Sequence, residues 1–201
     1  MEEKKTATLN SKTRTTYALI LIPIGIAINV IAGLIAGQLK LPIFMDSIGT
    51  IVIAAITGPI VGGVTGLLTN VVLGLIHGDV LGMAFGLCNM ASGLIVGYMA
   101  MKGKFKNWIH IVIATILVTL ANSLIAAPLV VFLYGGVSGA GVDLLVAGFL
   151  AAGNDIFSSA FVARLPVNLV DKGIAVIIAF LILKKLPTNM KNLIPPAKRK
   201  E

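Results

Sequence analysis

Long apolar runs, separated by short polar or glycine-rich breaks, make up most of this chain. Because roughly 20 apolar residues in a helix cross the hydrocarbon core of a bilayer, each run is a candidate membrane helix. The first run has 24 largely apolar residues, while the second and third are shorter and need shielding by neighbouring helices. Six membrane helices are predicted, over residues 15–38, 42–58, 59–76, 80–101, 107–134 and 164–186.

A further segment, 144–162, is apolar at first but is interrupted by Gly153-Asn154-Asp155 and by Ser158-Ser159. Counting it as a crossing would put the basic residues after the last helix on the opposite side from the other basic clusters. Six crossings put all the clusters on one side, which the excess of Lys and Arg in cytoplasmic loops favours. We therefore expect 144–162 to be an outer loop, a half-helix or a lid, and both termini to be cytoplasmic.

The composition supports this topology. The 201 residues are 57% hydrophobic and 12% charged, with a mean hydropathy of +1.00, whereas soluble domains carry about 25% charged residues. We expect an all-α integral membrane protein built as one six-helix bundle over residues 15–187. The tails 1–14 and 188–201 are expected in the cytoplasm.

The net charge of +8 is consistent with nucleic-acid binding only if the basic residues form one surface. Instead, 13 of the 16 Lys and Arg residues fall into three clusters at the ends of predicted helices. Such clusters indicate membrane topology rather than nucleic-acid binding. The clusters are Lys4, Lys5, Lys12 and Arg14, then Lys102, Lys104 and Lys106, then Lys184, Lys185, Lys191, Lys198, Arg199 and Lys200.

The second and third helices form the central hairpin, joined at Gly58-Pro59. Proline lacks an amide hydrogen and disfavours a helical residue before it, so this pair predicts a tight turn. Asp46 lies at the outer start of the hairpin, where we expect it to cap its helix. Small residues recur at a spacing of four, as in Gly62/Gly66, and predict close helix packing.

Polar residues are concentrated toward the predicted outer side, which indicates an outward-facing cavity. Isolated polar side chains are costly inside a membrane and need a structural or functional reason. The acids near that side are Asp46, Asp79, Asp143, Asp155 and Asp171, and the amides in the outer half or near the midplane are Asn70, Asn89, Asn122, Asn154 and Asn168. Asn29, between Gly25 and Gly33, is expected to pack the bundle instead.

The candidate substrate-binding residues are Asn70, His77, Asn89, Asn122, Asn154, Asp155, Arg164, Asn168 and Asp171. Arg164, Asn168, Asp171 and Lys172 lie within two helical turns and could form a polar wall, or an ion pair at the helix end. Asn89 and Asn122 could bind a ligand or hydrogen-bond between helices. His77 and Asp79 could bind a ligand or proton, or be solvated in a turn.

Catalysis and metal binding have little support in the sequence. There is no nucleophile elbow, zinc-protease motif or phosphate-binding loop, so we expect neither an enzyme nor ATP hydrolysis by this chain. The histidines His77 and His110 fall on opposite sides of the predicted bundle, so no metal site and no cofactor are expected. The lone Cys88 in an apolar run is interpreted as a packing residue.

Two segments carry a family resemblance. The hairpin LPIFMDSIGTIVIAAITGPIVGGVTGLLTN and the last helix RLPVNLVDKGIAVIIAFLILKKLP resemble the substrate-binding S components of energy-coupling factor (ECF) transporters. The resemblance covers residues from about 15 to 187 and is closest to the branch around riboflavin carriers.

The resemblance implies six helices, a vitamin-sized ligand bound at the outer side, and a bacterial or archaeal plasma membrane. It also implies partners, namely a transmembrane T component and two cytoplasmic ATPase subunits. In that family an Ala-x-x-x-Ala motif on the first helix docks the T component. Ala32 and Ala36 match its spacing here, with Gly25 and Gly33 adjacent.

Two other functions stay open at this point. The chain could be a structural or sensory membrane subunit whose polar residues only hold the bundle together. It could also be a stand-alone ion-coupled carrier that uses Asp171 or Asp155. The ligand of an S component stays equally open: riboflavin, a pyridoxine-type compound, a thiamine precursor and a modified purine base are all compatible.

Overall fold

The structure, a computed structural model, describes residues 11–186, and all of its regular elements are helices. The predicted tails therefore lie mostly outside the described residues. The helices are α1 (Ser11–Gln38), α2 (Ile48–Thr57), α3 (Pro59–His77), the short 3-10 helix η1 (Leu81–Phe85), α4 (Gly86–Met101), α5 (Trp108–Tyr134), α6 (Asp143–Ala151) and α7 (Ile156–Lys185).

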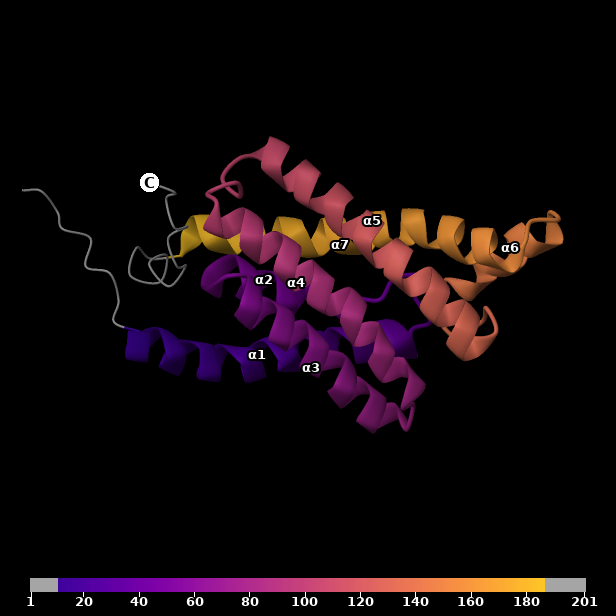
Figure 1. Cartoon of the computed structure of the whole chain (residues 1–201), viewed down its shortest axis with the longest axis horizontal. Helices are drawn as coiled ribbons and strands as arrows, with labels where there is room; N and C mark the ends of the chain where they lie inside the picture. Colours follow the sequence, from indigo (N-terminus) through magenta and orange to yellow (C-terminus); the bar gives the residue numbers. More distant parts are fainter. Residues whose placement is uncertain (1–10, 187–201) are drawn as a thin grey trace, which may run out of the picture.

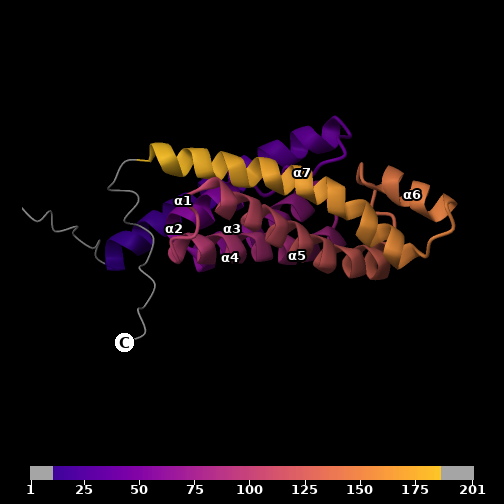
Figure 2. The ribbon, with the colours of Figure 1, turned by 90° about the horizontal axis from the view of Figure 1, so that it is seen from above.

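The long helices run side by side along the long axis of the molecule (Figure 1). Five of the described helices are long and apolar enough to cross a membrane, and α2 is a shorter apolar helix of 10 residues. The described start of α1 and the end of α7 lie at the same end of the bundle, whereas α6 lies at the other end (Figure 1). There, α6 packs beside the first turns of α7 (Figure 2).

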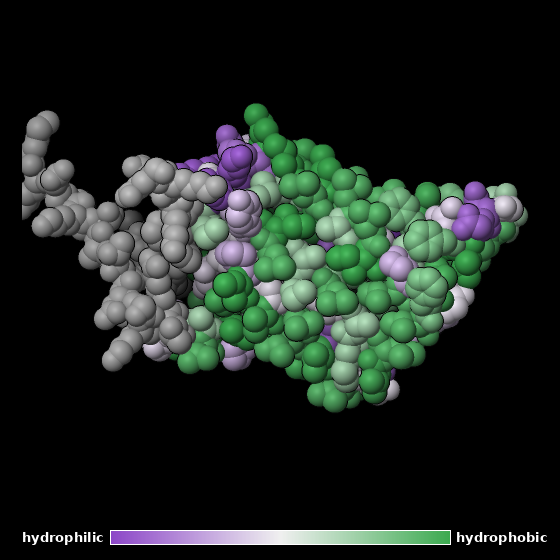
Figure 3. Space-filling view, viewed as in Figure 1, coloured by the Kyte–Doolittle hydropathy of each residue, from purple (hydrophilic) through white to green (hydrophobic). Residues whose placement is uncertain are grey.

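The surface has the apolar belt of a membrane protein. Apolar residues cover the middle of the face in Figure 3, and hydrophilic residues gather toward its two ends. Large aliphatic side chains are exposed on this belt, with Leu19 of α1 and Ile109 of α5 among the most exposed. Because a lipid environment can cover such a surface without an aqueous cost, the belt supports a multi-pass membrane protein.

The turn predicted at Gly58-Pro59 is confirmed. Helix α2 ends at Thr57 and α3 begins at Pro59, and Gly58 between them has a φ of 101°. That region of backbone space favours glycine, and proline suits the first position of a helix. These preferences of glycine and proline therefore explain why the turn lies at Gly58-Pro59.

Small-residue packing inside the bundle is also confirmed. A Cβ atom added to Gly93 of α4 would meet the backbone of Gly62 and Gly63 on α3, and one added to Gly62 would meet Ala54 of α2. The three helices approach backbone to backbone at this point. Lipid supplies no hydrophobic drive for helix association, so such close packing is a main source of cohesion.

Two predicted helix boundaries are wrong. Helix α2 begins at Ile48 rather than at residue 42, because the preceding residues form an irregular connection in which Met45 has a φ of 55°. Helix α7 begins at Ile156 rather than at 164, because Asp155 caps it by accepting from the amides of Phe157 and Ser158. The segment 144–162 is therefore divided between α6 and the first turns of α7.

The apolar core fills one half of the bundle. It includes Val96 of α4, Val118 of α5 and Phe180 of α7, and extends toward the lysine-rich turn after α4. In the other half, buried polar side chains replace much of this core, among them Asn70, Asn89, Asn122, Arg164 and Lys172. The predicted asymmetry of polarity is present in the fold.

Asn29 packs the bundle, as predicted. Its Nδ2 donates to the hydroxyls of Thr50 (2.8 Å) and Thr69 (2.9 Å), and its Oδ1 accepts from the backbone N–H of Gly49 at 2.6 Å. One fully buried amide therefore joins α1 to α2 and α3.

Candidate ligand-binding site

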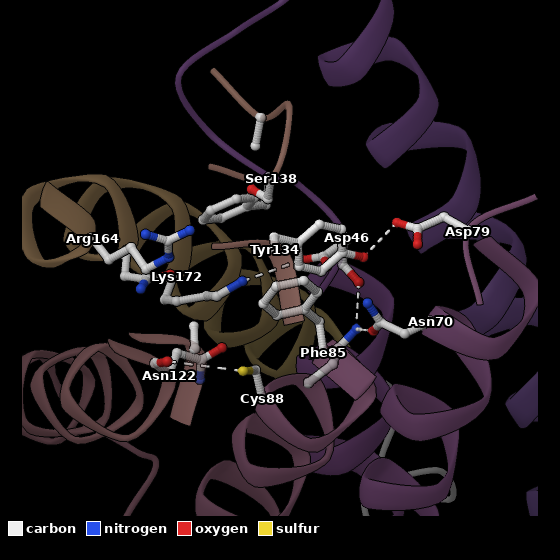
Figure 4. A pocket seen from close by; sticks show the side chains of 15 residues that line it. Asp46, Asn70, Asp79, Phe85, Cys88, Asn122, Tyr134, Ser138, Arg164 and Lys172 are labelled. Carbon is white, nitrogen blue, oxygen red and sulfur yellow. Dashed lines mark hydrogen bonds and ion pairs between the residues drawn. The ribbon is translucent and has the colours of Figure 1, made fainter. Parts of the chain in front are cut away.

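A cavity of about 190 Å³ lies in the polar half of the bundle (Figure 4). It is enclosed by α3, η1, α4, α5 and α7, together with the connections before α2 and before α6. Its walls are formed by Phe44, Asp46, Asn70, Asp79, Phe85, Cys88, Asn89, Asn122, Ala126, Tyr134, Ser138, Ala140, Arg164, Asn168 and Lys172.

Five of the candidate residues come together here from four helices. Asn70 belongs to α3, Asn89 to α4, Asn122 to α5, and Arg164 and Asn168 to α7. All five are buried. Residues separated by more than 90 positions thus share one small polar space, as expected for a binding site rather than for scattered structural amides.

The buried ammonium of Lys172 is the centre of an ion-pair network at the cavity wall. Its Nζ lies 2.7 Å from Asp171 Oδ2 and 3.3 Å from Asp46 Oδ1, and it donates to the hydroxyl of Ser47 over 2.9 Å. Asp171 Oδ1 accepts from the backbone N–H of Met45 at 2.7 Å. The network ties the connection between α1 and α2 to the middle of α7, so Lys172 does not snorkel to a helix end.

The expectation that Asp46 caps its helix is wrong. Ser47 occupies the capping position of α2 and makes no side-chain cap hydrogen bond. The Asp46 carboxylate instead turns into the cavity toward Lys172, while its backbone carbonyl accepts from Asn89 Nδ2 at 2.7 Å. The pairing with a buried cation on α7 outweighs a local cap.

Asp79 is part of the cavity wall rather than simply solvated in its turn. Its Oδ2 accepts from the Tyr134 hydroxyl at 2.6 Å, and its Oδ1 accepts from the Gly82 amide at 2.9 Å. The Tyr134 ring stacks on Phe85 with a centroid distance of 5.9 Å. These contacts fix η1 against the end of α5.

Three of the cavity asparagines, Asn89, Asn122 and Asn168, donate side-chain N–H groups to other parts of the protein. Asn89 Nδ2 donates to the Asp46 carbonyl and to Asn70 Oδ1, and Asn122 Nδ2 donates to Ser92 Oγ and to the Val118 carbonyl. Asn168 Nδ2 donates to Ser123 Oγ at 3.0 Å. Interhelical hydrogen bonding by Asn89 and Asn122 is therefore confirmed, whereas ligand binding by these cavity-lining residues stays a prediction.

Arg164 lies in the third turn of α7 rather than at the helix start, and is 2% exposed. Its Nη1 donates to the Ala160 carbonyl at 3.0 Å. Among residues 11–186, no carboxylate lies within 4 Å of its guanidinium. Figure 4 shows Arg164 and Lys172 on one side of the cavity, with Asn70 and Asp79 on the other.

Four candidate residues do not line this cavity. His77 is exposed at the end of α3 and borders a shallow side groove, and Asp171 lies behind the wall in the ion-pair network. Asn154 and Asp155 are exposed in the turn before α7, where Asn154 bonds the Phe149 carbonyl and Asp155 caps the helix. Binding by these four side chains stays a prediction.

The small residues predicted to dock a partner mostly face the chain itself. Gly25 and Ala36 are buried, and a Cβ on Gly25 would meet Ile53 and Thr65. Gly33 faces the connection after α1, and Ala32 is half-buried. The exposed face of α1 carries large aliphatic residues instead, and docking through α1 stays a prediction.

Several wall residues, such as Cys88, Ala126, Ser138 and Ala140, were not predicted. One of these wall residues could have been predicted from its helical spacing to a candidate residue. Asn122 and Ala126 are four residues apart in α5, so this pair lies on one helix face. Ser138 and Ala140 come from an irregular turn and had no periodic signal.

A family model described as ECF transporter, substrate-specific component, matches residues 17–183. The chain belongs to this family. Members are substrate-binding subunits of transporters and not enzymes, and the membrane-spanning character of the fold agrees with that assignment. Among curated proteins and among solved structures, no significant match to this S component was found.

Within residues 11–186 of this S component, no group of three or more His, Cys, Asp or Glu side chains could hold a metal ion. The carboxylates of the cavity wall already have partners, since Asp46 pairs with Lys172 and Asp79 accepts from a backbone amide.

Proposed function

We propose that the cavity captures a water-soluble vitamin or a related precursor at the outer side of the membrane for ATP-driven import. The observation that carries the proposal is the convergence of five buried polar side chains on one cavity in a member of this family. A small cavity with apolar walls and a few placed polar groups is the usual design of a small-molecule site.

The energy for import comes from partners in this proposal. The sequence has no phosphate-binding loop, so a T component and two cytoplasmic ATPases drive the transport cycle. An ion-coupled mechanism through Asp171 has less support, because that carboxylate already contacts Lys172 and the Met45 amide.

The proposed topology has six crossings with both termini in the cytoplasm. Helix α2 and the irregular residues before it form the second crossing, which is shielded because nearly all of α2 is buried. The cavity then opens outward, and the lysine-rich turn after α4 faces the cytoplasm.

Single-cysteine labelling tests this orientation. In a Cys88→Ala background, Asn154→Cys and Lys104→Cys place thiols at exposed positions on opposite ends of the bundle. A membrane-impermeant maleimide should label the first variant in intact cells, and the second only after lysis. The reverse pattern would overturn the proposed orientation.

Binding and transport test the function itself. Purified protein should bind one vitamin with nanomolar affinity and without dependence on an ion gradient. Cells should accumulate that vitamin only when the T component and ATPases are co-expressed. Uptake by the chain alone, driven by a gradient, would favour the ion-coupled carrier, and absence of binding across a vitamin panel would favour a structural or sensory subunit.

Docking of the T component through α1 is tested by co-purification. Ala32→Leu adds bulk at a half-exposed position of α1 and should weaken recovery of the T component. Ile28→Leu keeps the volume of an exposed side chain on the same helix and serves as the control. Equal recovery with both variants would move the docking surface away from Ala32.

A further inference from the structure

We infer that the cavity takes a small organic anion, whose carboxylate binds the guanidinium of Arg164 while an N–H or O–H group of the same molecule donates to Asn89 Oδ1. This inference rests on the proposed function, because it names the class of ligand for the same site.

The two cations of the cavity differ in how far the protein satisfies them. The ammonium of Lys172 has three donors and three polar partners, namely Asp171, Asp46 and Ser47. The guanidinium of Arg164 has five N–H donors and bonds one carbonyl, that of Ala160. The positive group with capacity left for a ligand is therefore Arg164.

Burial makes this difference important. Arg164 is 2% exposed, and a buried charge is stable only when it is paired and hydrogen-bonded. Asp143 is a nearby carboxylate, but it is not within 4 Å of Arg164, and its Oδ2 accepts from the amides of Ser138 and Gly139. A ligand carboxylate would supply the missing partner, since the planar guanidinium matches it in two parallel hydrogen bonds.

The side-chain amide of Asn89 has an unused acceptor, whereas Arg164 has unused donors. Asn89 Nδ2 donates to the Asp46 carbonyl and to Asn70 Oδ1, so the orientation of the amide is fixed. Its Oδ1 is buried and has no hydrogen-bond partner in the described part of the chain. Asn89 belongs to the wall of the same cavity as Arg164, so a ligand N–H or O–H group placed against its Oδ1 would satisfy this acceptor.

The size and walls of the cavity limit the rest of the molecule. About 190 Å³ is less than the roughly 300–1,000 Å³ of sites for drug-sized ligands. Phe44, Phe85 and Ala126 provide apolar surface between the polar ends. The ligand class is therefore a compact acid with a short apolar body and at least one hydrogen-bond donor.

Matched pairs of compounds test the inference on the wild-type protein. We suggest calorimetry with the full-length chain in detergent, comparing nicotinate with nicotinamide, biotin with biotin amide, and pantothenate with pantothenol. Uncharged riboflavin and pyridoxine complete the panel. One acid should bind, and its uncharged counterpart should bind at least 100-fold more weakly.

Variants locate the charge that matters. For the acid that binds, Arg164→Gln should weaken binding at least 100-fold, and Arg164→Lys should retain part of the affinity. Asn89→Asp should also weaken it, because a carboxylate there repels the anion. Lys106→Gln, at the other end of the bundle, is the control and should leave binding unchanged.

The outcomes separate the inference from the proposed function. Tight binding of an uncharged vitamin, or binding of an acid that Arg164→Gln leaves unchanged, would overturn the anion inference while the proposed function stands. Failure of every compound to bind would count against the proposed function itself. If Arg164→Gln does not fold, the matched pairs on the wild-type protein still decide.

Discussion

The ammonium of Lys172 lies 3.3 Å from Asp46 Oδ1, although the two residues are 126 positions apart in the sequence. One belongs to the middle of α7, and the other to the irregular connection before α2. Both line the cavity, so the contact that closes this part of the fold is also part of the site.

Replacing Lys172 by methionine should destabilise the protein strongly. The change keeps the apolar volume but leaves two carboxylates, Asp46 and Asp171, without their cation. Breaking a buried ion pair in this way costs about 3–5 kcal/mol. Thermal unfolding in detergent measures the effect, with Lys104→Met at an exposed site as the control. Equal midpoints for the two variants would contradict the role assigned to the network.

Introducing a methyl group at Gly93 should separate α3 from α4. A Cβ there would meet the backbone of Gly62, which cannot move aside as a side chain can. Overpacking of this kind costs about 1–3 kcal/mol. Gly148→Ala on α6, where a Cβ would meet nothing within 4 Å, should be neutral or slightly stabilising. Equal unfolding midpoints for Gly93→Ala and Gly148→Ala would argue against backbone contact between α3 and α4 at Gly93.

Removing the hydroxyl of Tyr134 should weaken ligand binding without unfolding the protein. Tyr134→Phe keeps the stacking on Phe85 but loses the hydrogen bond to Asp79. A hydrogen bond to a charged group contributes about 1.5–3 kcal/mol to the stability of the wall that it orders. Affinity should therefore fall by less than this full amount, within about tenfold. Titration with the ligand identified by the vitamin panel measures this. Phe132→Leu, an exposed change on the same helix, should bind normally.

The α6–α7 turn should loosen in acid because of Asp155. Hydrogen bonds from the Ser158 hydroxyl and amide, and from the Phe157 amide, hold the pKa of this carboxyl below its ordinary value. Folding therefore favours the ionised form. Its contribution is complete above the ordinary pKa of about 4 and is lost as the pH falls through the lower folded value.

Hydrogen exchange at the start of α7 measures this effect. Protection of the Phe157 and Ser158 amides, after correction for the intrinsic exchange rate, should fall on acidification in the wild-type protein. Asp155→Asn should show much less dependence on pH, because its side chain does not titrate. The same pH profile for both proteins would rule out the carboxylate as the cause.

Local chemistry made part of this fold predictable. The Gly58-Pro59 turn and the small-residue packing of Gly62 follow from backbone preferences that a short segment already contains. The start of α7 was missed because Gly153-Asn154-Asp155 was interpreted as an interruption. In the structure, Asp155 and Ser158 instead form a cap, a pattern that was present in the sequence.

The site was predictable as a region but not as a set of contacts. The clustering of amides and acids toward one side anticipated the cavity and five of its wall residues. The partner of Asp46 could not be predicted, because a contact over 126 positions depends on how α7 packs against α2. Likewise, nothing in the sequence distinguished Lys172, which is fully partnered, from Arg164, which has donors to spare.

The Asn29 amide also has a mechanical consequence. Helix α1 is the least buried of the five long helices. The hydrogen bonds of Asn29 with Thr50, Thr69 and Gly49 fix the rotation of α1 about its own axis. Turning α1 by a fraction of a turn would break all of them. A partner protein that packed on the outside of α1 would therefore meet a helix face whose orientation is already fixed.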